Sequence, residues 1–159
     1  MRDLDEKAVQ AKDKKGALGP DIDLDSFRSD PVHHDYIDDL GALSEADKKQ
    51  MILAGVDAKE RERSGSFVQK DTSVLHARSK QEGLEVIPIK EALKQYDWVK
   101  DYYWKLVGVD TDKYTARAQL DLHNGYLIRA LPGSKVVYPV QACLYLEKEG
   151  LGQNIHNIV

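Results

Sequence analysis

The stretch that decides the fold class runs from Asn124 to Gly150 and reads NGYLIRALPGSKVVYPVQACLYLEKEG. It holds two runs of strand-forming residues, separated at Pro132-Gly133 and interrupted again at Pro139. Every even-numbered residue from Val136 to Leu146 is apolar, and this period of two predicts strand with the even-numbered face buried. Because proline cannot donate to a ladder, we expect two strands with a bend instead of one long strand.

A third apolar alternation begins in GQNIHNIV and reaches the last residue, Val159. The three apolar runs begin near residues 126, 136 and 154, with Gly, Pro and Asn between them. This spacing is typical of the rungs of a solenoid, and its apolar face needs further layers from a partner or from sequence beyond Val159. We therefore predict an α+β fold in which an N-terminal helical region leads into the first rungs of a truncated parallel β-helix.

The rest of the chain divides by composition into a tail and a mixed domain. Residues 1–28 mix charges of both signs and contain GALGPDIDLD, which indicates a flexible charged tail. Residues 29–118 are assigned to an N-terminal helical and mixed domain. Residues 119–159 are assigned to the start of the β-helix core.

Local signals place helices and strands within the mixed domain. Pro31 and the apolar residues up to Leu40 predict a helix from Ser29 to Gly41, and Ser44 is a capping signal for a helix that ends at Gly55. Short strands are predicted within 64–79 and 85–89, and a short helix within 110–120. A long helix is predicted over 89–107, where apolar residues recur at three- and four-residue steps: Ile89, Leu93, Tyr96, Val99, Tyr103 and Leu106.

Charge and composition limit the kinds of partner. The 159 residues include 23 Lys and Arg against 27 Asp and Glu, a net charge of −4, so the basic excess that nucleic-acid binding needs is missing. The N-terminal sequence differs from a signal peptide, and no apolar run approaches the roughly 20 residues of a membrane span. We expect a cytoplasmic protein without nucleic-acid or membrane partners. Its single cysteine, Cys143, fits a reducing compartment.

Three segments, taken in order, resemble the SufB/SufD family of iron–sulfur cluster assembly proteins. The segment GYLIRALPGSKVVYPVQACLYLEKEGLGQ, residues 125–153, follows a similar succession of glycine, aromatic, aliphatic and proline residues. DWVKDYYWKLV at 97–107 and DKYTA at 112–116 are similar to the helix that precedes the family core. RSGSFVQKDTSVLHA at 63–77 is similar to an earlier N-terminal segment. The resemblance covers residues 29–159.

The resemblance implies a scaffold or accessory subunit of the SUF iron–sulfur cluster assembly machinery that is not itself an enzyme. It implies a SufC-type ABC ATPase as partner, a SufB/SufD paralogue or a second copy in a heterodimer or homodimer, and a cysteine desulfurase system. The family's cluster-building residues map onto no position here, so the chain is interpreted as an N-terminal fragment. Whether it is SufB-like or SufD-like stays open.

The sequence offers no catalytic, cofactor-binding or metal-binding residue that we would assign. Cys143 supplies one thiolate where a cluster normally takes about four, so we expect it to pack in a strand, and an iron–sulfur cluster is left to the full-length complex. His33 and His34 lie beside Asp35, Asp38 and Asp39, but His34 and Asp38 alone would make a weak metal site, and a solvated acidic face is expected. No phosphate loop appears, so the ATPase must be another protein.

Two other hypotheses come from different functional classes. A small metal-dependent β-barrel enzyme of the cupin type would use His33, His34, His123 or His156 and would contain stoichiometric metal. A stand-alone β-rich protein-interaction module would fold cooperatively as a monomer.

Overall fold

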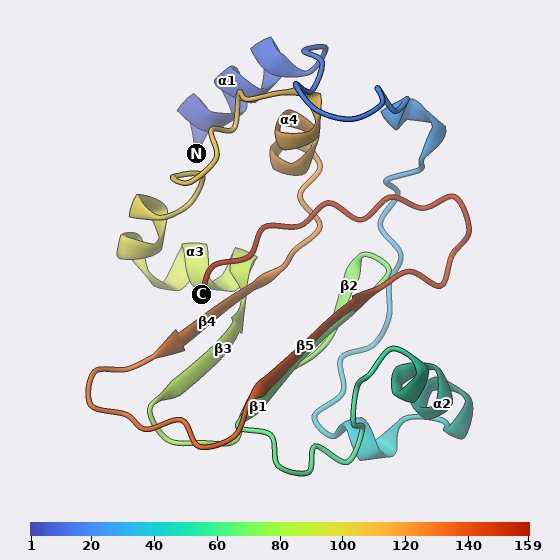
Figure 1. Ribbon diagram of the computed structural model, residues 1–159, viewed down its shortest axis with the longest axis vertical. Helices are drawn as coiled ribbons and strands as arrows, with labels where there is room; N and C mark the ends of the chain where they lie inside the picture. Colours follow the sequence, from blue (N-terminus) through green and yellow to red (C-terminus); the bar gives the residue numbers. More distant parts are fainter.

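The computed structural model describes residues 1–159, and Figure 1 shows its elements around two small sheets that lie side by side. Three short 3-10 helices span residues 24–26, 40–42 and 97–101. The other elements, in chain order, are α1 (Arg2–Ala11), α2 (Glu45–Leu53), β1 (Gly65–Lys70), β2 (Ser73–Ser79), β3 (Leu84–Pro88), α3 (Ile89–Gln95), α4 (Lys113–Leu120), β4 (Tyr126–Ala130) and β5 (Val140–Tyr145).

The first sheet has the strand order β2-β1-β5. β1 and β2 form an antiparallel hairpin whose two-residue turn is Asp71-Thr72, while β5 returns from far along the chain to pair with β1 in parallel. All six residues of β1 are buried. A strand that is covered on both faces has no solvent-exposed face, so its sequence does not need to alternate between apolar and exposed polar residues. This explains why GSFVQK shows no such alternation.

The two faces of this sheet pack against different partners. Val68 of β1 belongs to an apolar cluster with Leu40, Met51 of α2 and Cys143 of β5. Phe67, on the opposite face, belongs to a cluster with Leu84 and Val86 of β3. Burying each of these large side chains stabilises the fold by about 1.5–3 kcal/mol, so β1 joins the α2 side of the molecule to the β3 side.

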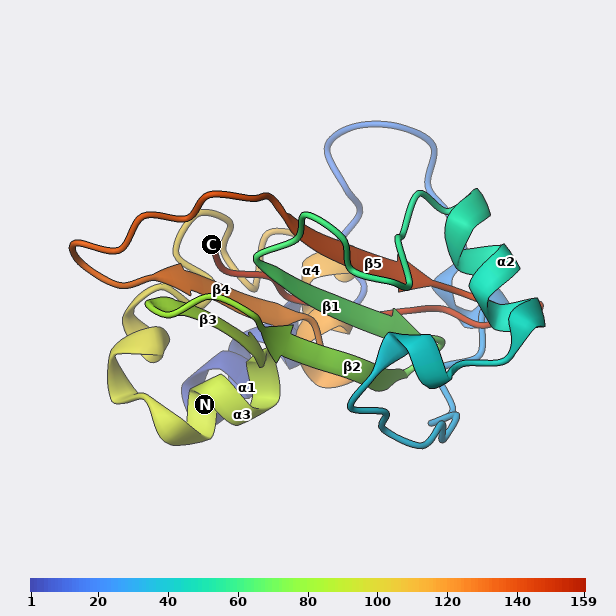
Figure 2. The ribbon, with the colours of Figure 1, turned by 90° about the horizontal axis from the view of Figure 1, so that it is seen from below.

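The second sheet is the antiparallel pair β3-β4, in register from Leu84 opposite Ala130 to Pro88 opposite Tyr126. α3 begins directly after Pro88 and buries Ile89, Ala92 and Leu93 against Leu127 of β4. α1 and α4 pack against each other through small residues, and Figure 2 shows α2 and α3 at opposite ends of the molecule. The cluster at the α1–α4 contact consists of Ala8, Ala11, Val109 and Ala116.

The prediction of a parallel β-helix is wrong. In a β-helix the successive apolar runs would stack on one another in parallel, but here they go to different neighbours. β4 pairs antiparallel with β3, and β5 pairs with β1 of the other sheet. The third run makes only isolated parallel bridges, Asn124 with Ile155 and Leu127 with Ile158. The fold is α+β with one mixed and one antiparallel sheet.

One of the predicted helices is also wrong, and another is shorter than predicted. Residues 32–37, here called the strap, are extended along β2, because Thr72 and Ser73 bond the backbone of Val32 and the N–H of Ile37 donates to the carbonyl of Leu75. These non-local bonds replace the helical period that the apolar residues suggested. The helix predicted over 89–107 ends at Gln95, since Tyr96 is extended, and a 3-10 helix follows.

The buried face of β5 differs from the prediction as well. Odd-numbered Gln141 and Cys143 are buried, whereas Ala142 is exposed. Gln141 can be buried because its amide is fully hydrogen-bonded: its oxygen accepts from the N–H of Asp57 at 3.1 Å, and its nitrogen donates to the Asp57 carbonyl and to Ser66 Oγ. Val140 and Leu144 pack partly against the Phe67 cluster on the other face.

Most of the remaining local predictions are confirmed. Ser44 caps α2 by accepting from the N–H of Asp47. β1, β2 and α4 lie within the predicted ranges, and β3 begins one residue earlier than predicted, at Leu84. Residues 2–11 of the expected tail form α1, which buries Ala8 and Ala11 against α4. The division into domains at residues 28 and 118 stays a prediction.

Candidate functional site

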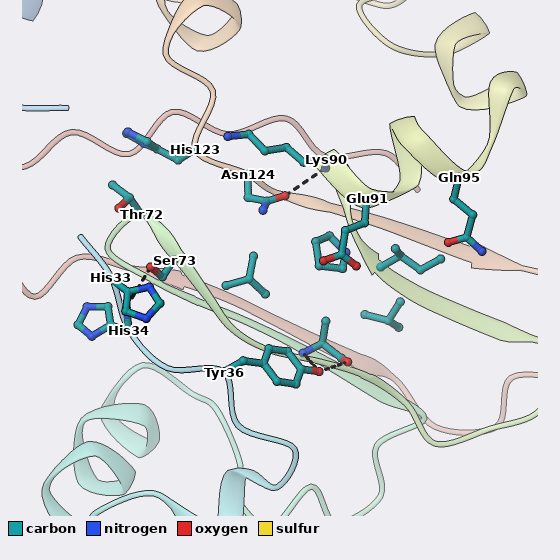
Figure 3. A pocket seen from close by; sticks show the side chains of 15 residues that line it. His33, His34, Tyr36, Thr72, Ser73, Lys90, Glu91, Gln95, His123 and Asn124 are labelled. Carbon is teal, nitrogen blue, oxygen red and sulfur yellow. Dashed lines mark hydrogen bonds between the residues drawn. The ribbon is translucent and has the colours of Figure 1, made fainter. Parts of the chain in front are cut away.

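A groove of about 780 Å³ lies between β2 on one side and β3 with α3 on the other. Figure 3 shows the strap residues His33, His34 and Tyr36 along one wall and Lys90, Glu91 and Gln95 of α3 along the other. β2 and β3 are the edge strands of their sheets, and they are not paired with each other. The groove therefore runs between two sheet edges.

His34 is held by a buried carboxylate. Its Nε2 lies 2.8 Å from Asp71 Oδ2, and the side chain of Asp71 is fully buried at the β1–β2 turn. Asp71 Oδ1 accepts from the backbone N–H groups of Glu147 and Lys148 at 2.7 and 3.0 Å. Gln153 donates to the Asp71 carbonyl. This one residue therefore fastens the strap, the hairpin turn and the segment after β5.

The electrostatics of Asp71 follow from these contacts. Burial favours the neutral carboxylic acid, but the hydrogen bonds from Lys148, His34 and Glu147 outweigh it, so the pKa of Asp71 lies below its usual value. The carboxylate is thus retained as an acceptor at neutral pH. The backbone also suits this residue, since φ is 51° at Asp71 and Asp tolerates left-handed backbone better than most side chains.

Lys70, the residue before Asp71, is also tied to two segments. Its Nζ lies 3.1 Å from Asp47 of α2 and 3.1 Å from Glu147 after β5. Burial acts to lower the pKa of Lys70, but the bonds that its ammonium donates to the Glu147 and Asp47 carboxylates prevail and raise the pKa above its usual value. The ammonium of Lys70 therefore connects the hairpin to α2 and to the segment after β5.

The far wall of the groove carries an ammonium without an ion-pair partner. Lys90 makes no side-chain hydrogen bond or salt bridge, and burial, followed by the nearby charge of Lys94, lowers the pKa of its amine. Its backbone N–H donates to Asn124 Oδ1 at 3.2 Å, which orients the start of α3 (Figure 3). This wall offers one cation, one carboxylate at Glu91 and one amide at Gln95.

The histidines named in the sequence have different roles. His33, His34 and His123 line the same groove, but His33 is exposed beside Asp35, and His123 uses both ring nitrogens, on the Ser29 carbonyl and on the Asn154 N–H. His156 lies away from the groove against the Tyr103 and Trp104 rings, and burial lowers its pKa to about 4. Asp38 and Asp39 are exposed, and the Asp39 carboxylate accepts from the Gly41 N–H.

No group of three or more His, Cys, Asp or Glu side chains is arranged so that it could hold a metal ion. Cys143 is buried in β5 beside Val68, and burial raises the pKa of its thiol. The assignment of no catalytic, cofactor-binding or metal-binding residue stays a prediction.

Sequence reasoning missed Asp71, the residue with the most connections near the groove. Its signal in the sequence is weak: Asp-Thr between two strand-like runs favours a tight turn. Nothing local indicates that the carboxylate is buried or that residues 147–153 return to it. None of the helices is both long and apolar enough to cross a membrane.

Comparisons with known proteins place the chain in a family. No family model matches the sequence. An iron–sulfur cluster assembly SufBD family protein from Methanothermobacter thermautotrophicus strain Winter is 40% identical over 164 residues, which cover 100% of this chain and 40% of the relative. Its counterpart in strain Delta H is 39% identical over 164 residues, with the same two coverages.

A third relative, an iron–sulfur cluster assembly SufBD family protein from Archaeoglobus fulgidus, is 46% identical over 113 residues. That match covers 71% of this chain and 30% of the relative. The chain spans about 40% of the length of the two Methanothermobacter relatives. The resemblance seen in the sequence is confirmed, and the chain belongs to the SufBD family of iron–sulfur cluster assembly proteins.

Proposed function

We propose that the protein carrying this chain takes part in the assembly of iron–sulfur clusters as a scaffold or accessory subunit that is not itself an enzyme. The observation that carries the proposal is the 40% identity to a SufBD family protein across the whole chain. Identity at this level over 164 residues is more than a shared fold requires, and the relatives are named for cluster assembly.

The chemistry of the chain supports a role in which the cluster ligands come from elsewhere. A cluster takes about four soft ligands, and the only thiol here is Cys143. Because burial raises its pKa, this thiol stays protonated at neutral pH, and the thiol form is a poor ligand for iron. The chain then contributes the frame on which other parts of the assembly act.

The proposed partners are a SufC-type ABC ATPase, a SufB/SufD paralogue or a second copy, and a cysteine desulfurase that delivers sulfur. ATP hydrolysis belongs to the ATPase, because the glycines of this chain lack the spacing of a phosphate-binding loop. Since cluster assembly with free thiols needs a reducing compartment, we place the protein in the cytoplasm.

Reconstitution tests the proposal. The full-length protein is purified with the SufC-type ATPase of the same organism and incubated without oxygen with ferrous iron, cysteine and a cysteine desulfurase. We expect co-elution with the ATPase and accumulation of acid-labile sulfide and iron in a ratio near one. A protein that neither binds the ATPase nor accumulates iron and sulfide would overturn the proposal.

A Cys143→Ser variant tests where the ligands lie. We expect it to accumulate labile iron and sulfide to within about twofold of the parent protein, because a buried thiol supplies no cluster ligand. Circular dichroism on the same sample verifies that the variant is folded. A folded variant that accumulates neither would show that Cys143 is a ligand after all.

A further inference from the structure

Two buried titratable side chains outside the groove face each other without a hydrogen bond. His76 of β2 is fully buried, and the side chain of Glu60, in the loop between α2 and β1, is 5% exposed. His76 Nε2 and Glu60 Oε1 lie 3.6 Å apart, and neither atom has a hydrogen-bond partner. Such groups are rare in folded proteins because each one loses its hydration without compensation.

The other ring nitrogen fixes where one proton is. His76 Nδ1 lies 2.8 Å from the backbone carbonyl of Ile37 in the strap. A carbonyl oxygen only accepts, so Nδ1 must carry a hydrogen and donate it. If the ring is neutral, Nε2 then presents a lone pair to a carboxylate, and two acceptors face each other in the protein interior.

One additional proton removes this conflict. With a proton on Nε2 the ring donates to Ile37 on one side and faces Glu60 as a cation on the other, so both orphaned atoms gain a partner. Imidazole is a stronger base than a carboxylate, which places the proton on His76.

We propose that His76 and Glu60 form a buried imidazolium–carboxylate pair that latches the strap to the rest of the fold. The latch joins three segments, namely the strap through Ile37, β2 through His76, and the loop after α2 through Glu60. Few other hydrogen bonds attach the C-terminal end of the strap to the rest of the fold. The Ile37 N–H donates to the Leu75 carbonyl, and the Tyr36 hydroxyl donates to the Ala77 carbonyl.

The surroundings of the pair contain few other titratable groups. The Tyr36 ring stacks over His76 with centroids 6.4 Å apart, and Lys80 Nζ donates to the backbone carbonyl of Glu60 at 2.7 Å. Across the sheet, His76 is opposite Val68, which is in turn opposite Cys143 of β5. Among these side chains, Glu60 supplies the carboxylate that faces the ring.

The latch bears on the groove because the strap forms one of its walls. His33, His34 and Tyr36 line the groove, and Tyr36 is the residue that precedes the latched Ile37 (Figure 3). Loss of the buried proton would leave two acceptors opposed and would favour separation of strap and loop. The shape of the groove wall is therefore coupled to a proton held inside the fold.

Nuclear magnetic resonance of the ring nitrogens tests the proposal directly. In ¹⁵N-histidine-labelled protein at pH 7.5, we expect both nitrogens of His76 to be protonated. In Glu60→Gln, the amide can donate to a neutral ring, so Nε2 should move to the shift of an unprotonated nitrogen. An unprotonated Nε2 in the parent protein would overturn the proposal and would leave a bridging water as the explanation for the unpartnered atoms.

Amide hydrogen exchange at Ile37 tests the latch itself. Glu60→Ala leaves the ring without a partner, and we expect the Ile37 N–H to exchange at least ~10-fold faster than in the parent protein. Glu60→Gln should stay within about threefold of the parent rate, because its amide still bonds the ring. Glu62→Gln, which changes an exposed carboxylate two residues away, is the matched control. Equal exchange rates in the Ala and Gln variants would contradict the latch.

Discussion

The two sheets are held in place by different kinds of contact. Around β2-β1-β5, buried polar side chains connect strands to loops: Asp71 binds the segment after β5, and Gln141 binds the loop at Asp57. Around β3-β4 the contacts are mainly apolar and aromatic, with Leu127 of β4 packed among Ile89, Leu93, Val99 and Tyr103. The first sheet therefore combines apolar packing with buried polar connections, whereas the second is held mainly by packing.

This difference predicts how each region responds to change. A buried polar connection has a modest net stabilising effect when it is intact but a large cost when one partner is removed, because the remaining groups stay desolvated. Apolar packing tolerates changes of polarity at its exposed rim but not added volume where backbones meet closely. Four substitutions test the comparison.

The largest effect is expected for Asp71→Ala. It leaves the N–H groups of Glu147 and Lys148 and the ring of His34 without their acceptor, and we expect the free energy of unfolding to fall by about 3–5 kcal/mol. Urea unfolding followed by circular dichroism measures the loss. Asp35→Ala, which removes an exposed carboxylate beside His33, is the matched control and should leave the midpoint unchanged. Equal midpoints for the two variants would show that Asp71 does not connect its three segments.

The next effect is expected at Gly125, where the β3-β4 region brings two backbones together. Its φ is 123°, and a Cβ there would collide with the carbonyl of His156 and the side chain of Asn157. We expect Gly125→Ala to lower the free energy of unfolding by about 2–3 kcal/mol. Gly133 has a φ of 80° but open space around it, so Gly133→Ala should cost only about 1 kcal/mol. A smaller loss of unfolding free energy at Gly125 than at Gly133 would mean that the segment around His156 and Asn157 moves aside to accommodate the added methyl group.

Local signals in the sequence predicted those elements whose contacts are local. Ser44 and the spacing after it place α2, and the strand-like runs around the Asp71-Thr72 turn place β1 and β2. The strap was misread because its apolar spacing suits a helix in isolation, whereas the Thr72 and Ser73 side chains bond it from about 40 residues away. The sequence of one segment does not show whether its helical spacing or hydrogen bonds from distant residues will determine its structure.

The same limit explains the β-helix and the groove. The apolar run at 126 was correctly predicted as a strand, and the run beginning near 136 forms a strand only after Pro139, as β5. Their partners, β3 and β1, could not be inferred from spacing alone. His34 and His123 both line the groove although they are 89 positions apart in the sequence. No local sequence motif could therefore have predicted it. The family, in contrast, was predictable because the order of the similar segments can be recognised without knowing which strands pair.

A moderate effect is expected from pH through His156. Its pKa falls from 6.5 to about 4 because it is buried against Tyr103 and Trp104. Above pH 6.5 the ring is neutral in both the folded and the unfolded chain, so burying it does not reduce the free energy of unfolding. Between pH 6.5 and about 4 only the unfolded chain takes up the proton, so stability falls as pH falls.

The loss at pH 4.5 should be about 1–2 kcal/mol once solvent screening of this partly buried ring is allowed for. Urea unfolding of the parent protein and of His156→Phe at pH 7.5 and 4.5 measures it. The Phe variant keeps an aromatic side chain against the two rings, and it should lose less stability between the two pH values. His33→Gln serves as control and should respond to pH like the parent protein. A parent protein and Phe variant with the same pH response would assign the effect to other groups.

The smallest effect is expected at the rim of the aromatic region. Leu106 is 100% exposed, next to Val107, which is half exposed, although the sequence placed Leu106 on the buried stripe of a helix. Since it buries no area in the folded chain, Leu106→Ser should leave the midpoint of urea unfolding unchanged at low protein concentration. The same measurement at tenfold higher concentration sharpens the comparison. A midpoint that rises with concentration in the parent protein but not in Leu106→Ser would show that this side chain is covered by another chain, and that packing in the β3-β4 region continues beyond one molecule.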